Sequence, residues 1–298
     1  MIFDSHCHIT PHGYTSVKYN YYMEQLAISM SEASVNKAIV MLNPFVKELM
    51  CEPNHRVRFI GESKGGRLEC LTCGKLLLRC KHDPYRLLNL SLLSESRKLK
   101  GKVYPFVYLT TCASTFQQEI DYFEYNHFDE FYGFKFISTF NMVSVCQLKG
   151  IRTNKPLLFH TKNDIYADAM NVINVTQHLS TPVILAHFCS FNDKALEYVN
   201  QKDSIYYTDI SPLLDLKNNY ESRNNLKIYP VWNNYSQFSF ESFIKRRIES
   251  LNPKKILFGT DTPWGNMKSE VQYFLSLDLP KYIIDNICCN NFNVIVRE

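Results

Sequence analysis

Three features of the sequence together predict an α/β fold built as a (β/α)8 TIM barrel. The chain has 298 residues, close to the roughly 250 residues that one such barrel uses. Eight apolar, β-rich runs recur along it without internal alternation, as expected for parallel strands buried on both faces. Amphipathic stretches typical of helices separate many of these runs. A doubly wound open sheet is the alternative fold, because it has the same alternation of elements.

The predicted elements fill most of the chain, so we expect one barrel over residues 1–298. In chain order, the predicted strands are residues 2–8, 37–43, 103–109, 131–138, 155–160, 181–188, 204–210 and 255–261. The predicted helices are residues 20–34, 84–99, 115–126, 165–179 and 240–250. Asp164 is the expected N-cap of the helix over 165–179. Pro84 stands where the start of a helix tolerates proline.

Two connections are too long for a simple barrel. One covers residues 44–83, after the second strand, and the other covers residues 211–239, after the seventh. Because both follow strands, we expect both on the face where barrels place their active sites. The second connection, which contains Trp232 and Tyr235, is predicted to be a loop on the substrate side, with a variable surface loop as the alternative.

Composition narrows the classes of protein to consider. A net charge of +4 is too small and too dispersed to indicate nucleic-acid binding, and no apolar run approaches the roughly 20 residues of a membrane span. We expect no cleavable signal peptide, because a strand begins at residue 2. Ten cysteines without such a signal indicate thiols or metal ligands in a reducing compartment, so a cytoplasmic location is expected. A homo-oligomer is compatible with the sequence, which does not fix the oligomeric state.

The first predicted strand carries the motif Asp4-Ser5-His6-Cys7-His8. Alternate side chains of a strand point to the same face, so Asp4, His6 and His8 are expected to project together. Two imidazoles side by side on a rigid strand are suitable ligands for a metal ion. The alternative is a chance pair of histidines on a surface strand.

Three later strands end in residues of the same chemical kinds. His160 closes the fifth strand, His187 stands on the sixth, and Asp261 closes the eighth within Phe-Gly-Thr-Asp. A single buried histidine is more often a hydrogen-bonded core residue, whereas an unpaired buried carboxylate costs several kcal/mol. In a closed barrel, side chains at the carboxyl ends of strands converge. The set therefore predicts one metal centre.

This mixture of ligands suits a divalent ion, for which zinc is the first expectation and manganese the second. Imidazoles and one carboxylate can hold the ion and leave a position open, where it would activate water at neutral pH. Asp261 could accept the proton of that water, and His187 could bind a second ion or polarise the substrate. Lys135, on the fourth strand, would bridge two ions if carboxylated. Alternatively, its charge pairs with a substrate anion or with a neighbouring carboxylate.

With these motifs in order, the chain resembles the amidohydrolase superfamily of metal-dependent barrel hydrolases, and within it the amidohydrolase-related branch. The motifs concerned are His6-x-His8, Gly133-x-Lys135, His160 in LLFHT, His187 in ILAHF, Asp261 in FGTDTPW and residues 287–292, which resemble the closing helix of that branch. The resemblance covers roughly residues 1–43 and 103–298. It implies that His6, His8, His160 and Asp261 hold the metal, and that His187 is a catalytic residue or a ligand of a second ion. In branches with two ions, a glutamate or a carboxylated lysine on the fourth strand usually bridges them. Glu130 precedes this strand, which itself has no glutamate, and the resemblance therefore favours a single ion.

The 44–83 insertion contains its own candidate metal site. Cys70-x-x-Cys73-Gly74 is a zinc-knuckle pattern, and Cys51-x-x-x-His55 precedes it. Gly65-Gly66 lies near the middle of the intervening segment, as a hairpin apex would require. We therefore predict a zinc-ribbon-like unit with a structural zinc held by Cys51, His55, Cys70 and Cys73. In one alternative, Cys80 and His82 replace Cys51 and His55, and in another all the cysteines are free.

The leading hypothesis for function is a hydrolase in which metal-activated water attacks a C–N or C–O bond of a small, anionic substrate such as an amide, lactone or ester. Lys135 or Lys162 could bind the anion. A non-oxidative decarboxylase of an aromatic or unsaturated acid on the same site is the alternative. Two further alternatives are a deoxyribonuclease-like phosphodiesterase and a non-catalytic barrel whose insertion docks a partner protein. No nucleic-acid or membrane partner is expected.

Overall fold

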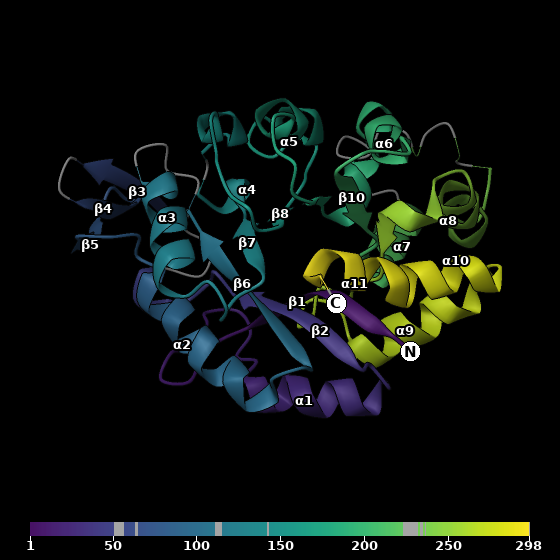
Figure 1. The fold of residues 1–298 in the computed structure, drawn as a ribbon, viewed down its shortest axis with the longest axis horizontal. Helices are drawn as coiled ribbons and strands as arrows, with labels where there is room; N and C mark the ends of the chain where they lie inside the picture. Colours follow the sequence, from purple (N-terminus) through teal and green to yellow (C-terminus); the bar gives the residue numbers. More distant parts are fainter. Residues whose placement is uncertain are drawn as a thin grey trace.

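A computed structural model gives the fold of the chain (Figure 1). The structure describes residues 1–50, 57–62, 65–110, 115–141, 143–222, 232, 235 and 237–297. Among the helices of these ranges, none is both long and apolar enough to cross a membrane.

Eight parallel strands form the central sheet, in the order β1-β2-β6-β7-β8-β9-β10-β11. Their bounds are β1 Phe3–Ile9, β2 Lys37–Leu42, β6 Val103–Leu109, β7 Gly133–Phe136, β8 Leu157–Phe159, β9 Val183–Leu185, β10 Tyr206–Asp209 and β11 Ile256–Leu257. The sheet closes where β1 meets the segment after β11: Ser5 N donates to Phe258 O at 2.8 Å, and His8 N donates to Thr262 O at 2.6 Å. The predicted (β/α)8 barrel and all eight predicted strands are therefore confirmed.

The helices lie around the barrel (Figure 1). The five predicted helices are present as α1 Met23–Glu32, α2 Arg86–Ser96, α3 Phe116–Asn126, α5 Ala169–Thr176 and α8 Phe240–Glu249. The closing helix expected over 287–292 is present in the π-helix Asn286–Asn290 and α11 Asn291–Val296. Further helices, which we did not predict, are α4 Ser138–Asn141, α6 Asp193–Asn200, α7 Leu213–Ser222, α9 Met267–Ser276 and α10 Lys281–Asp285.

The prediction that Asp164 caps the helix over 165–179 is wrong. The helix begins four residues later, and the side chain of Asp168 accepts the hydrogen bond from Asn171 N. Asp164 instead accepts hydrogen bonds from Tyr166 N and Ala167 N, both at 2.9 Å. A short aspartate side chain stabilises such a turn as readily as it caps a helix, so the sequence pattern alone did not separate the two positions.

Apolar side chains close the N-terminal end of the barrel. Phe292 on α11 contacts Phe3 at the start of β1, with 5.1 Å between ring centroids, and Tyr104 near the start of β6, with 5.4 Å. Ile295 and Val296 belong to the same buried cluster. Because this end is filled with apolar groups, polar side chains can gather only at the opposite, C-terminal end of the strands.

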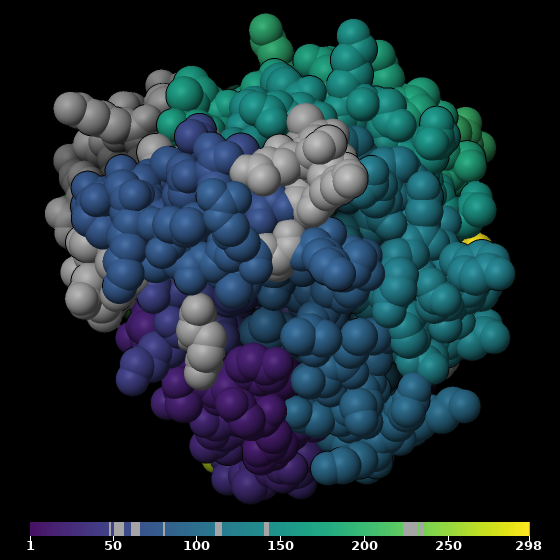
Figure 2. Space-filling view, turned by 90° about the vertical axis from the view of Figure 1, so that its left-hand side faces the viewer, coloured from purple at the N-terminus to yellow at the C-terminus, as the bar shows by residue number. Residues whose placement is uncertain are grey.

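The insertion after β2 forms a separate three-stranded antiparallel sheet, β3-β4-β5. Its strands are β3 Val57–Glu62, β4 Gly65–Cys70 and β5 Leu76–Cys80, and Figure 2 views the side of the molecule on which it lies. The predicted hairpin is present, because Glu62 pairs with Gly65 and Gly61 with Gly66. The apolar side chains of Val57, Phe59 and Leu68 are buried, so one face of this sheet packs against the rest of the protein.

The connection after β10 differs from our prediction of a substrate-side loop. Its first part is helix α7, and Trp232 is buried, 2% exposed, in ring contact with Phe191 and Tyr220. Trp232 is therefore a core residue of this connection. The start of the connection, at Ser211, Pro212, Asp215 and Leu216, lines a cavity at the barrel mouth, and residues 223–231, 233, 234 and 236 of the connection lie outside the described residues.

Candidate metal centre

Strand β1 and the segment after β11 bring three of the predicted ligands together. His6 Nε2 and His8 Nε2 each lie 3.4 Å from Asp261 Oδ1, and the candidate ligand atoms of the three residues all lie within 4.8 Å of one another. The other residue of the motif, Asp4, has a structural role. Its carboxylate accepts hydrogen bonds from His6 N and from Thr260 N and Oγ1, and it thereby ties β1 to the segment that carries Asp261.

Hydrogen bonds fix which ring nitrogen of each histidine is free. His8 Nδ1 lies 2.8 Å from Leu42 O, which can only accept, so Nδ1 carries the proton and Nε2 carries the lone pair. His6 Nδ1 lies 2.9 Å from Asp209 Oδ2, and the same reasoning leaves the lone pair of His6 on Nε2. Burial, followed by the charge of Lys135, lowers the pKa of His6 to about 4, and burial lowers the pKa of His8. Both rings are thus neutral and aim their lone pairs at the Asp261 side, as a divalent ion requires.

Asp261 is ionised in this surrounding. Burial alone would raise the pKa of its carboxyl group, but the nearby His6, His8 and His187 rings hold that pKa well below its usual range. Its backbone has a left-handed conformation, with φ of +54°. The donor set of two neutral imidazoles and one carboxylate fits a borderline divalent cation such as zinc.

His160 and His187 form a pair beside these three residues. His187 Nδ1 lies 2.7 Å from Ser211 O, so it donates, and His187 Nε2 must accept from His160 Nδ1 at 2.8 Å. This leaves a lone pair on His160 Nε2. His160 lines the same cavities as Asp261 but is not in the group of three whose ligand atoms lie within 4.8 Å. His187 contacts His160 directly, and its predicted catalytic or second-metal role stays a prediction.

Lys135 lies fully buried on β7. Its Nζ is 2.9 Å from His6 Nε2, and burial lowers the pKa of this lysine to about 7, although Asp261 and Asp209 oppose that shift. In this structure Lys135 donates to the same lone pair of His6 that an ion would use. Binding of an ion to His6 would therefore replace this hydrogen bond.

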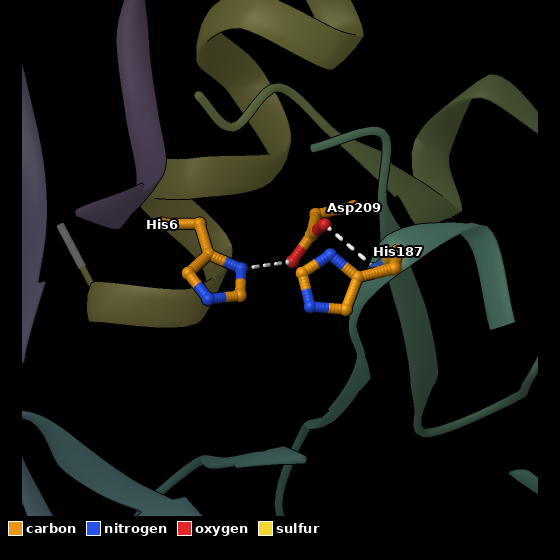
Figure 3. A group of neighbouring side chains, drawn as sticks. All are labelled: His6, His187 and Asp209. Atoms are coloured by element: carbon orange, nitrogen blue, oxygen red, sulfur yellow. Dashed lines mark hydrogen bonds and ion pairs between the residues drawn. The ribbon is translucent and has the colours of Figure 1, made fainter. Parts of the chain in front are cut away.

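Asp209, the last residue of β10, is a member of the site that we did not predict. Its carboxylate contacts His6 Nδ1 and the backbone N of His187 (Figure 3). Burial would raise its pKa, but His6 and His187 hold that pKa well below its usual range. A signal was present in the sequence: Thr208-Asp209 closes the seventh strand as Thr260-Asp261 closes the eighth.

The backbone that carries His187 is unusual. Residues 187–191 form a left-handed turn in which all five φ angles are positive, between +51° and +57°. For residues other than glycine this conformation costs roughly 1–2 kcal/mol each. The side chains of Phe188, Cys189 and Phe191 are buried, and this packing helps to hold the turn.

Two cavities adjoin at the barrel mouth, and His160, Asp261 and Trp264 line both. The first, about 240 Å³, is mostly apolar and has Pro44, Phe45 and Ile137 in its wall. The second, about 430 Å³, is more polar and includes Lys162, His187 and Asp215. Trp264 contacts both Phe45 and the candidate ligand His8: its ring centroid lies 6.0 Å from that of Phe45 and 4.9 Å from that of His8.

The predicted zinc site of the insertion is only partly described. Cys70 is buried and Cys73 is exposed, and they flank a tight turn in which Gly74 N donates to Cys70 O at 2.9 Å. Gly74 has φ of +72°, a conformation that glycine adopts without strain. Cys51 and His55 lie outside the described residues, as does the side chain of Cys80, and His82 is exposed. The insertion zinc therefore stays a prediction.

Comparison with solved structures places this fold among known barrels. The chain superimposes on a probable 2-pyrone-4,6-dicarboxylic acid hydrolase from Acinetobacter baumannii with citric acid bound, at a TM-score of 0.61 and 11% identity over 100% of this chain and 99% of that one. A 2,6-dihydroxybenzoate decarboxylase from Rhizobium gives 0.59 and 11%, over 99% and 98%. An amidohydrolase from Burkholderia multivorans with bound HEPES gives 0.58 and 11%, over 100% and 99%. The chain has the fold of these proteins. No family model and no curated protein matches its sequence.

Proposed function

We propose that the protein is a metal-dependent hydrolase that uses one divalent ion, held by His6, His8, His160 and Asp261, to cleave a C–N or C–O bond of a small, anionic substrate. The observation that carries this proposal is the convergence of His6, His8 and Asp261, whose ligand atoms all lie within 4.8 Å of one another. The free Nε2 lone pair of His160, beside the same cavities, supplies the fourth ligand. When bound, such an ion activates water and polarises a substrate oxygen.

The chain's own residues would perform the remaining steps. Asp261 stays ionised because its histidine neighbours lower its pKa, so its carboxylate can accept a proton from water. His187 supports His160 through their 2.8 Å hydrogen bond, and its ring reaches the polar cavity, where it could polarise the substrate. Trp264 lines both cavities and contacts the ring of His8, and it would help to exclude bulk water from the centre.

The two cavities suggest how a substrate would lie. An apolar or planar part fits the cavity walled by Phe45, Ile137 and Trp264, and the anionic part fits the polar cavity near Lys162. The scissile bond would then lie above His160 and Asp261, which both cavities share. The citric acid in the Acinetobacter barrel and the aromatic acid named for the Rhizobium enzyme are anions of this size class, and they support the proposal.

The proposal is tested by metal analysis combined with product assays. We expect about one barrel ion per chain, and we expect the metal-loaded protein to hydrolyse members of a panel of carboxylated lactones, esters and amides. Release of CO₂ from aromatic or unsaturated acids, without hydrolysis, would instead support the decarboxylase alternative. Two barrel ions, lost when bicarbonate is removed, would support the bridging role of a carboxylated Lys135. A metal-free, inactive protein would contradict all three.

Replacing Lys162 by glutamine is expected to raise KM for an anionic substrate about three- to five-fold with little change in kcat, because this partly exposed group would contribute binding energy equally before and during reaction. The neighbouring Asp164 carboxylate, 3.9 Å away, already weakens its pull on an anion. Steady-state kinetics measure the effect. Lys268→Gln, at an exposed position on α9, is the control, and an equal effect in both variants would remove Lys162 from substrate binding.

For the insertion, we propose a structural zinc held by Cys51, His55, Cys70 and Cys73. Cys70→Ser is expected to release one zinc per chain, because a thiolate is a far better zinc ligand than a hydroxyl group. It should leave the barrel ion in place. Zinc is counted by elemental analysis, with Cys146→Ser, at an exposed cysteine outside the insertion, as the control. An unchanged zinc content in Cys70→Ser would contradict the proposal.

A further inference from the structure

Asp209 accepts four hydrogen bonds in the interior of the barrel mouth, where it is fully buried. Its Oδ2 accepts from His6 Nδ1 at 2.9 Å. Its Oδ1 accepts from His187 N at 3.0 Å, from Ser211 N at 3.1 Å and from Ser211 Oγ at 2.6 Å. One carboxylate therefore joins β1, β10 and the turn after β9 (Figure 3).

The first effect of this carboxylate is on His6. An ionised acceptor at Nδ1 keeps the proton on that nitrogen and leaves the lone pair on Nε2, 3.4 Å from Asp261 Oδ1. A carboxylate behind a histidine ligand also fixes the ring's orientation and raises its basicity as a ligand. A neutral group at this position would permit the opposite tautomer, in which Nε2 carries the proton and cannot bind an ion.

The second effect passes through Ser211 and His187. Asp209 holds Ser211 by its N and Oγ, the Ser211 carbonyl accepts from His187 Nδ1, and His187 Nε2 accepts from His160 Nδ1. The Ser211 carbonyl can only accept, so it fixes the proton on His187 Nδ1, and His187 Nε2 in turn fixes the proton on His160 Nδ1 and the lone pair on His160 Nε2. The same carboxylate thus determines the tautomer of His6 directly, and it positions the backbone carbonyl on which the tautomer of His160 depends.

A third, independent observation concerns the backbone. The left-handed turn over residues 187–191 is unfavourable for residues other than glycine. Its first N–H, that of His187, donates to Asp209. This bond holds the turn at the residue whose ring supports His160.

We propose that Asp209 is a positioning residue of the metal centre, which orients His6 directly and His160 through Ser211 and His187. The inference rests on the proposed function, because it requires that these histidines bind an ion. Asp209 bonds the Nδ1 side of His6, opposite the Nε2 that lies near Asp261, and in this arrangement it would not be a ligand.

The test compares Asp209→Asn with a matched control, Asp83→Asn. Asp83 is also a buried carboxylate, 3% exposed, and accepts from Thr110 and Tyr85, but contacts none of the candidate ligands. Affinities for Zn²⁺ and Co²⁺ are measured on the full chain by competition with a chelating dye. Co²⁺ bound to thiolates gives a near-ultraviolet charge-transfer band that nitrogen and oxygen ligands do not give. Co²⁺ binding to the cysteines of the insertion is therefore measured separately from Co²⁺ binding in the barrel.

We expect Asp209→Asn to weaken metal binding in the barrel about 10- to 100-fold, with Asp83→Asn close to wild type. At saturation, the visible spectrum of Co²⁺ in Asp209→Asn should equal that of wild type. Ser211→Ala, a milder change that removes one donor to Asp209, should weaken binding about five-fold, and it provides the test if Asp209→Asn does not fold.

The outcomes separate this inference from the proposed function. If the wild-type barrel binds no ion, the proposed function fails and the inference fails with it. If wild type binds an ion, but Asp209→Asn and Ser211→Ala both bind as tightly as Asp83→Asn, only the positioning role is overturned. A changed Co²⁺ spectrum at saturation would make Asp209 a direct ligand and would also overturn it.

Discussion

Replacing both His6 and His8 by alanine is expected to abolish binding of the barrel ion and to lower hydrolytic activity by more than about 100-fold, since losing a group that merely supports a ligand already costs 10- to 100-fold. The two rings provide two of the three donors that converge within 4.8 Å. Without them, Asp261 would be left as the single member of that group. Metal content after dialysis and the hydrolysis rate measure the result.

The fold should survive this double substitution. Asp209 keeps three of its four hydrogen bonds, from His187 N and from Ser211 N and Oγ. Leu42 O loses one donor, and Lys135 Nζ loses its acceptor on His6. Each unsatisfied buried group costs about 1–3 kcal/mol, within the roughly 5–15 kcal/mol by which a protein is stable. Circular dichroism should therefore be native-like, with a lower Tm.

A suitable control is His178→Ala. His178 Nε2 donates to the backbone O of Ile151 at 2.7 Å, much as His8 Nδ1 donates to Leu42, but His178 takes no part in the candidate centre. This variant should keep the ion and the activity. A His6→Ala, His8→Ala protein that is folded and still holds the barrel ion with wild-type affinity would exclude the proposed ligand set.

The barrel could be predicted because parallel strands buried on both faces have continuous apolar runs, and eight such runs alternate with amphipathic stretches along this chain. The ends of strands were harder to place than their centres: the run over 131–138 contains β7 only at Gly133–Phe136. Helices α6 and α7 were missed for different reasons. The apolar stripe of α7 is narrow, with Leu213 and Leu216 as its buried residues. In α6, Ala195, Leu196 and Val199 form a clear buried stripe, so this helix could have been predicted.

For the candidate centre, the sequence indicated which residue types stand at strand ends, but not which of their atoms meet. His160 and His187 both close apolar strands, and only the structure shows that they hydrogen-bond to each other. Lys135 could not be placed from its strand alone, because its contact with His6 comes from the other side of the barrel. Asp209 was overlooked although it ends a predicted strand. Its importance lies in its hydrogen bonds to residues 203 and 22 positions away, and sequence patterns do not reveal such contacts.

Replacing Phe292 by alanine is expected to destabilise the protein by about 3–5 kcal/mol, the range for removing a fully buried phenylalanine. Phe292 is 1% exposed and its ring contacts Phe3 and Tyr104, so its removal leaves a cavity where α11 closes the N-terminal end of the barrel. Rigid aromatic neighbours cannot easily collapse into that space, which places the expected loss toward the upper part of the range.

The measurement is the free energy of unfolding in urea, with Val294→Ala as the control on the same helix. Val294 is 54% exposed, and exposed substitutions usually change stability by no more than about 0.5 kcal/mol. The affinity for the barrel ion should be unchanged in both folded variants, because Phe292 and the candidate ligands lie at opposite ends of the strands. Equal stability losses in the two variants would mean that α11 does not close the barrel. Weakened ion binding in folded Phe292→Ala would mean that the two ends are not independent.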